Sequence, residues 1–116
     1  MRIRYNRHMI VRVTPREAEA LIAQEDLDVV DVRDAGDWAA GHIPRARSIP
    51  LAEITANPRG VLSRDGVVFV CARGVRSLTA ARAAEAAGFE RLYSVEGGTL
   101  GWRGEDLPLV TEGAGI

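Results

Sequence analysis

The single cysteine of this chain stands at the boundary between an apolar run and a short cationic loop. Residues 67–70 read VVFV, Cys71 follows directly, and residues 72–77 read ARGVRS. The N–H groups of a tight loop, a helix N-terminus and nearby arginines each lower the pKa of a thiol. We therefore interpret Cys71 as a nucleophile that reacts as a thiolate.

The loop after this cysteine is short enough to surround the sulfur with its own N–H groups. Successive N–H groups of a curled loop form an anion-binding nest, and Gly74 permits the positive φ that such a curl needs. Arg73 and Arg76 are placed to bind an anionic substrate. For Arg76 a structural role stays open beside substrate contact, namely an ion pair with Asp31 or Glu96 that holds the loop.

Composition narrows the possible functions of the chain. Its 116 residues fit one domain, and a net charge of −1 argues against a nucleic-acid or membrane-surface partner. All 15 basic residues are arginine, which excludes a Schiff-base lysine and a lysine-bearing phosphate loop. For a chain of this size a monomer is the default expectation.

The inventory of cysteine and histidine argues against disulfide and metal chemistry. A lone cysteine forms no intrachain disulfide, so we expect a reducing, cytoplasmic setting. His8, His42 and Cys71 lack the spacing of metal ligands, so we expect no metal and no cofactor. The basic N-terminus has no long apolar stretch behind it, so neither a signal peptide nor a transmembrane segment is expected.

Short apolar runs alternate with segments of helical pattern along the whole chain. Thr14, Pro15 and Glu17 form a capping box with proline at the first helical position. Strands are expected over residues 27–32, 46–49, 66–70 and 91–95, and helices over 34–40, 51–56, 76–87 and 99–104. This alternation is typical of an α/β fold with a mainly parallel sheet, whose ligands bind at the carboxyl ends of strands.

We take residues 1–116 as a single domain with two peripheral segments. Residues 1–9 are interpreted as a basic N-terminal extension or a short edge strand, and the Gly-rich tail over 113–116 as frayed. No repeat, linker or low-complexity tract interrupts the pattern between them.

Three segments in this order resemble the single-domain rhodaneses, a family of sulfurtransferases. Asp31-Val32-Arg33 with Asp37-Trp38 and residues 41–46 (GHIPRA) is similar to the first signature, residues 71–77 to the active-site loop, and residues 96–102 (EGGTLGW) to the C-terminal signature. The resemblance covers nearly the whole chain. It implies a five-stranded parallel sheet flanked by helices on both faces, and a persulfide carried on Cys71. Arg45 stands where glycine is usual, a departure expected to perturb a surface turn.

The resemblance implies a thiosulfate sulfurtransferase that acts through Cys71. If the thiolate is already formed, no general base is needed, in line with the lack of a histidine partner for Cys71. A sulfane sulfur would pass from a donor such as thiosulfate or a persulfide to cyanide, a thiol or a protein thiol. Residues expected to bind substrate are Ala72, Arg73, Gly74, Val75, Arg76 and Ser77. Asp31 and Arg33 are supporting residues, which we expect to brace loops by hydrogen bonds.

Other polar and aromatic residues are assigned structural roles. We expect His42 to bind a backbone group in its turn, and Trp38 and Trp102 to pack in the core or a pocket wall. For Ser77 two roles stay open, a helix cap or a donor to the sulfur.

Two other functions compete with a sulfurtransferase. The alternative within the family is a persulfide carrier that delivers sulfur to a partner protein with little turnover of its own. The rival outside it is a cysteine-loop phosphatase. Tyrosine phosphatases place arginine six positions after the cysteine, whereas here that position is Ser77 and arginine comes one residue early.

Overall fold

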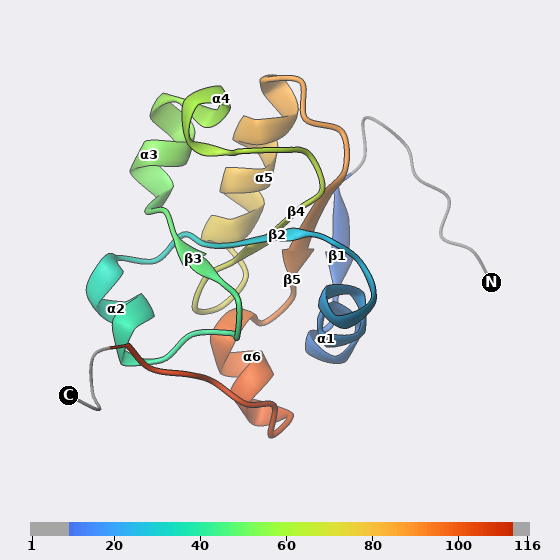
Figure 1. The fold of residues 1–116 in the computed structure, drawn as a ribbon, viewed down its shortest axis with the longest axis vertical. Coiled ribbons are helices and arrows are strands. Elements are labelled where there is room, and N and C mark those ends of the chain that lie inside the picture. Colours follow the sequence, from blue (N-terminus) through green and yellow to red (C-terminus); the bar gives the residue numbers. More distant parts are fainter. Residues whose placement is uncertain (1–9, 113–116) are drawn as a thin grey trace.

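A parallel sheet of five strands runs through residues 10–112, the part of the chain that the computed structural model describes (Figure 1). The strands are β1 (Val11–Val13), β2 (Asp28–Asp31), β3 (Arg47–Ser48), β4 (Val67–Val70) and β5 (Leu92–Val95). Their order in the sheet is β1-β5-β4-β2-β3, and every neighbouring pair is parallel. The most apolar strand, β4, is central and wholly buried, as a strand covered on both faces must be.

Six helices cover the two faces of this sheet in the described residues. They are α1 (Pro15–Gln24), α2 (Ala35–Ala40), α3 (Leu51–Ala56), α4 (Pro58–Val61), α5 (Arg76–Ala86) and α6 (Gly98–Gly104). Helices α1 and α6 lie on one side of the sheet and α3, α4 and α5 on the other (Figure 1). The sequence resemblance implies a five-stranded parallel sheet with helices on both faces, and that architecture is confirmed.

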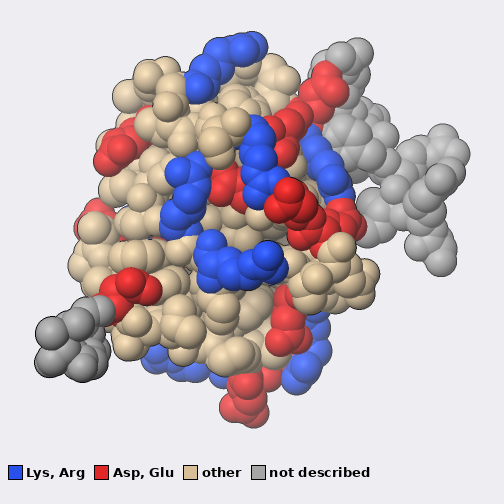
Figure 2. Space-filling view, in the orientation of Figure 1, with Lys and Arg blue, Asp and Glu red and all other residues tan. Residues whose placement is uncertain are grey.

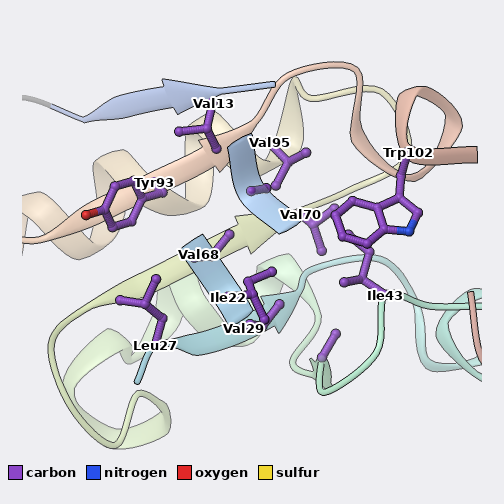
Figure 3. Packing of buried hydrophobic residues seen from close by; sticks show 12 residues of the cluster. Val13, Ile22, Leu27, Val29, Ile43, Val68, Val70, Tyr93, Val95 and Trp102 are labelled. Atoms are coloured by element: carbon purple, nitrogen blue, oxygen red, sulfur yellow. The ribbon is translucent and has the colours of Figure 1, made fainter. Parts of the chain in front are cut away.

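Side-chain alternation along β4 divides the core into two clusters. Val68 and Val70 face α1 and α6, where they pack with Trp102 (Figure 3). Val67 and Phe69 face α3 and α5, and Cys71 continues their side of the strand. Because side chains of a strand alternate between faces, the cysteine is directed toward the N-terminal end of α5.

The start of α1 shows how local sequence sets the helix boundaries. The hydroxyl of Thr14 accepts a hydrogen bond from the Glu17 N–H at 3.2 Å, and the Glu17 carboxylate accepts one from the Thr14 N–H at 2.9 Å. The predicted capping box is thus confirmed, and α1 buries Ala18 and Ile22 against the sheet.

Two short elements differ from the sequence expectation. Strand β1 lies at Val11–Val13, where three residues are too few to show a periodic pattern. Helix α4 is absent from the elements expected from the sequence. Pro58 begins it, because the Asn57 side chain accepts a hydrogen bond from the Gly60 N–H at 3.2 Å and proline suits a first helical turn. The predicted N-terminal extension, residues 1–9, and the predicted tail, 113–116, lie outside the described residues.

Arg45 adopts the backbone conformation for which glycine is usual. Its φ is 76°, in the left-handed region that costs an L-residue about 1–2 kcal/mol. Its guanidinium donates to the carbonyl oxygen of Ile22 at 3.0 Å, a bond that ties the turn to the end of α1. The turn therefore holds arginine in place of the usual glycine.

Charged side chains are intermixed on the face of the molecule seen in Figure 2. Arg47 pairs with Asp28 at 2.8 Å, and further pairs join Arg64 to Asp26 and Arg91 to Glu25. None of the helices in the described residues is long and apolar enough to cross a membrane.

The start of α6 is joined directly to the segment that carries Cys71. The N–H of Thr99 donates to the Cys71 carbonyl at 2.8 Å, and that of Leu100 donates to the Ala72 carbonyl at 3.1 Å. Gly98, with φ of 58°, makes this approach possible, since a Cβ there would overlap the Cys71 carbonyl oxygen. Gly98, the first residue of α6, therefore permits close packing of the helix against the loop.

Substitution of Gly98 by alanine is expected to destabilise the fold severely. Overlap with the loop backbone and the left-handed φ together should lower the free energy of unfolding by about 2–4 kcal/mol. The matched control is Gly104→Ala in the same helix, where an added Cβ meets nothing within 4 Å. Urea unfolding checks both variants; equal stability of the two would contradict this role of Gly98.

Candidate active site

The loop after β4 directs two backbone N–H groups at the sulfur of Cys71. The N–H of Gly74 donates to Sγ at 3.1 Å and the N–H of Ser77 donates at 3.3 Å. Ser77 lies in the first turn of α5, whose N–H groups have no partner within the helix. Gly74 has φ of 95°, and a Cβ there would stand 3.0 Å from the Gly97 nitrogen. The loop has the curled form that an anion-binding nest requires.

The electrostatic balance at Cys71 favours the thiolate. Burial raises the pKa of the thiol, since the residue is only 1% exposed. Hydrogen bonds from the Ser77 hydroxyl and from the N–H groups of Ser77, Arg73 and Gly74 act in the opposite direction. They outweigh the burial, so the pKa of Cys71 lies below its ordinary value.

A pocket lined by two arginines lies at Cys71. Cys71, Ala72, Arg73, Val75 and Arg76 surround a pocket of about 220 Å³. Arg73, Val75 and Arg76 are exposed at its mouth, and neither arginine forms an ion pair with another residue in the range 10–112. Both guanidinium groups are thus available to an anionic ligand beside the sulfur.

The two acids considered as partners of Arg76 form ion pairs with other arginines. Asp31 pairs with Arg33 at 2.8 Å, and Glu96 lies 3.8 Å from Arg12. No ion pair joins Arg76 to either acid in the described chain. Arg76 therefore lines the pocket without holding the loop through these acids.

Asp31 and Arg33 hold the turn that follows the neighbouring strand β2. The Arg33 guanidinium donates to both Asp31 oxygens, at 2.8–3.2 Å, and to the Gly41 carbonyl oxygen at 2.7 Å. Asp31 is fully buried, and the Arg33 N–H donates to it at 3.0 Å. This pair fixes the first signature segment at the carboxyl ends of the strands, where Cys71 also lies.

His42 and the two tryptophans have structural contacts. The Nδ1 atom of His42 lies 2.7 Å from the Trp38 carbonyl oxygen, and the two rings stack 4.2 Å apart. Trp102 is buried in the core and donates its indole N–H to the Pro108 carbonyl oxygen at 2.8 Å. Within the described residues, no group of three or more His, Cys, Asp or Glu side chains is arranged to hold a metal ion.

Comparison with known proteins identifies the family. The sequence profile of the rhodanese-like domain matches residues 14–105. The chain belongs to the rhodanese-like domain family. It is 38% identical over 101 residues to YibN of Escherichia coli K12, an uncharacterised protein, covering 84% of this chain and 71% of YibN. It is 39% identical over 92 residues to the thiosulfate sulfurtransferase GlpE of Pseudomonas putida, covering 79% of this chain and 84% of GlpE.

Solved structures agree with this assignment. The crystal structure of a rhodanese-related protein from Thermoplasma volcanium superposes with a TM-score of 0.76 at 28% sequence identity. The match covers 88% of this chain and 99% of that protein. The part of the chain that matches the rhodanese-like domain therefore includes strands β2 to β5 and the helices α1 to α6.

A buried serine pair extends the sulfur site of this rhodanese-like domain toward β5. The Ser77 hydroxyl lies 3.5 Å from Sγ and 2.8 Å from the hydroxyl of Ser94. Ser77 and Ser94 are 0% and 2% exposed. No side chain caps the start of α5. The Ser77 hydroxyl therefore does not act as a helix cap, and it contacts the sulfur instead.

The serine pair is fully hydrogen-bonded when Cys71 is a thiolate. A thiolate only accepts, so the Ser77 hydroxyl donates to it, and Ser94 then donates to the Ser77 oxygen. A hydroxyl bonded to an anion is a charge-assisted donor and is stronger than a neutral one. Ser94 thereby positions the proton of Ser77 toward the sulfur.

Ser94 is the residue of this site that sequence reasoning missed. Strand β5 is buried throughout, and Ser94 pairs in register with Phe69. By alternation its side chain shares the sheet face of Phe69 and Cys71. The sequence did contain a signal for Ser94. It is a polar residue in a buried strand, two positions after the first residue of that strand.

Removal of the Ser94 hydroxyl is expected to raise the pKa of Cys71. A neutral hydrogen bond contributes about 1 kcal/mol, and 1.36 kcal/mol corresponds to one pKa unit, so Ser94→Ala should raise it by about 0.5 to 1. The pH dependence of alkylation by iodoacetamide measures this pKa, and its midpoint should move to higher pH.

The control for this prediction is Ser48→Ala. The Ser48 hydroxyl is also buried but has no hydrogen-bond partner among the described residues, and it lies in the edge strand β3. Its removal should leave the alkylation midpoint unchanged. A midpoint that moves equally in both variants, or in neither, would contradict the positioning role of Ser94.

Proposed function

We propose that this rhodanese-like domain is a sulfurtransferase that carries a sulfane sulfur on Cys71. The observation that carries the proposal is the set of N–H and O–H donors directed at a buried Sγ, with hydrogen bonds at 3.1 and 3.3 Å from the backbone. These donors suit a sulfur anion, first the thiolate and then the terminal sulfur of a persulfide. The thiosulfate sulfurtransferase GlpE, to which the chain is similar, supports the same reaction class.

The first half-reaction loads the cysteine. The Cys71 thiolate attacks the outer sulfur of thiosulfate, a new S–S bond forms, and the bond between the two thiosulfate sulfurs breaks. Sulfite leaves with the electron pair of that bond, and the outer sulfur of the persulfide keeps one negative charge. No proton moves in this step, so no general base is required when the thiol is already ionised.

The second half-reaction returns the cysteine to its starting state. A nucleophile such as cyanide or a thiolate attacks the outer sulfur, the S–S bond of the persulfide breaks, and Cys71 leaves as a thiolate. The leaving group is stabilised by the same donors that stabilised the attacking thiolate. One set of N–H groups thus serves both half-reactions.

The arginines at the mouth of the pocket are assigned to the donor. Thiosulfate is a dianion, and Arg73 and Arg76 line the pocket around the sulfur without an ion pair elsewhere in the described chain. Guanidinium groups bind oxyanions through paired N–H donors. We predict that the reducing conditions of the cytoplasm keep Cys71 available for this chemistry.

Incubation with thiosulfate should add one sulfur atom to the protein. Intact mass spectrometry measures this gain, dithiothreitol should remove it, and Cys71→Ser should abolish it. The near-isosteric serine keeps the loop packed, and a matching circular dichroism spectrum shows that its fold is intact. No gain from thiosulfate or from any other sulfane donor would sink the proposal.

Further assays on the same protein distinguish a sulfurtransferase from a persulfide carrier and from a phosphatase. Rapid discharge of the loaded protein by cyanide or a small thiol supports turnover. Slow release to small acceptors with fast transfer to one protein thiol would instead favour the persulfide carrier. Hydrolysis of an aryl phosphate faster than conversion of thiosulfate would reassign the loop to phosphate chemistry.

Substitution of Arg73 should weaken binding of the anionic donor more than it slows the chemistry. For Arg73→Ala we expect KM for thiosulfate to rise about tenfold, equivalent to about 1.4 kcal/mol of binding, with a smaller fall in kcat. Arg82→Ala is the control, because Arg82 is an exposed arginine of α5 without an ion pair in residues 10–112. An unchanged KM in Arg73→Ala would place that side chain outside donor binding.

A further inference from the structure

A second pocket lies beside the one that contains Cys71. It encloses about 250 Å³ and shares Ala72 with the sulfur pocket. Its charged walls are Arg33, Asp37 and Arg103, and its apolar walls include Leu100 and Leu109. The donor reaction described above uses none of these five side chains to bind thiosulfate, so the pocket needs another explanation.

The pocket carries opposite charges at Arg103 and Asp37. Arg103, an exposed residue of α6, forms no ion pair within the described chain, and neither does the exposed carboxylate of Asp37. Arg33 is 9% exposed, and its guanidinium donates to the Asp31 carboxylate and the Gly41 carbonyl oxygen. The pocket thus presents a cationic side and an anionic side to one ligand.

The pocket adjoins the pocket that contains Cys71. Ala72, the residue directly after the cysteine, lines both of them. Hydrogen bonding to Asp31 raises the pKa of Arg33, burial opposes that rise, and the charges of Asp37 and Cys71 add to it. A ligand held in this pocket therefore lies next to the pocket of the reacting sulfur.

We propose that this pocket binds the amino-acid end of a low-molecular-weight thiol that accepts the sulfur, with Arg103 and Arg33 facing its α-carboxylate and Asp37 its α-ammonium group. Leu100 and Leu109 contact its methylene groups. The inference rests on the proposed sulfurtransferase function and names the class of acceptor. Cysteine, and the γ-glutamyl end of glutathione, carry the required pair of charges on one carbon.

The size of the pocket favours a small acceptor. Ligand pockets range from about 300 to 1,000 Å³, and this one, at about 250 Å³, lies just below that range. An amino-acid head group fits such a volume, and its side chain would extend past Ala72 into the sulfur pocket. Arg103, Asp37 and the two leucines are thereby specificity-determining residues for the acceptor.

The transfer balances without any further reactant. The acceptor thiol loses its proton to solvent, and the resulting thiolate attacks the outer sulfur of the Cys71 persulfide. The persulfide S–S bond breaks, Cys71 leaves as a thiolate, and the acceptor departs as a persulfide anion with the sulfane sulfur. The number of negative charges is the same before and after the attack.

The test measures discharge of protein already loaded with sulfur by thiosulfate. The probes are cysteine, which has both charges; cysteamine, which lacks the carboxylate; 3-mercaptopropionate, which lacks the ammonium group; and 2-mercaptoethanol, which lacks both. At equal thiolate concentration, cysteine should discharge the protein about tenfold faster than 2-mercaptoethanol, with the other two between them. Equal rates for all four probes would overturn the proposal.

Two variants assign the effect to the pocket. Arg103→Gln and Asp37→Asn should each slow discharge by cysteine about tenfold and leave discharge by 2-mercaptoethanol unchanged. Arg82→Gln, which removes an exposed arginine outside the pocket, should change neither. A loss with both thiols would indicate damage to the sulfur site and would count against recognition of the amino-acid end.

A binding measurement keeps this inference separate from the proposed function. If thiosulfate does not load Cys71, the sulfurtransferase proposal fails, but calorimetric titration with S-methylcysteine still reports on the pocket. We expect saturable binding that Arg103→Gln and Asp37→Asn each weaken about tenfold. No binding by the wild type, or binding that neither variant weakens, would overturn the assignment of the pocket.

Discussion

The donation of backbone N–H groups to the sulfur of Cys71 is the interaction on which the rest of this structure depends. An anion at a residue that is 1% exposed is unfavourable unless hydrogen bonds replace the water it has lost. Gly74 and Ser77 supply those bonds at 3.1 and 3.3 Å. The central, wholly buried strand β4 carries the cysteine to this position, and α5 begins where its free N–H groups meet the sulfur.

The remaining signature segments keep this loop in its curled form. Helix α6 donates to the carbonyls of Cys71 and Ala72 and so ties the first residues of the loop to α6. Gly98 allows that close approach. The Asp31–Arg33 pair fixes the neighbouring turn at the same sheet edge. The three motifs separated in sequence are therefore parts of one support for a sulfur anion.

The sequence predicts features that depend on local rules and leaves out those that depend on the register between strands. The capping box at Thr14, the helix after Cys71 and the parallel α/β class follow from residue pattern, with the five-strand sheet implied by the family resemblance. Ser94 could not be assigned because its contact with Ser77 joins residues 17 positions apart through strand pairing. The pocket proposed for the acceptor could not be predicted either. Arg33, Asp37 and Arg103 belong to separate segments that only the folded chain brings together.

Sulfur chemistry at this site depends on the ionisation of one thiol, which a direct titration of Cys71 measures. Ultraviolet absorbance of the thiolate, followed against pH in the folded protein, reports this pKa without any substrate. Because Cys71 is the only cysteine, the thiolate signal comes from this residue alone, once the tyrosine background is subtracted with Cys71→Ser. We expect a pKa below the ordinary value of about 8.5, because the hydrogen bonds to the sulfur outweigh its burial. A pKa at or above that value would show that burial outweighs the hydrogen bonds, and would contradict a preformed sulfur nucleophile.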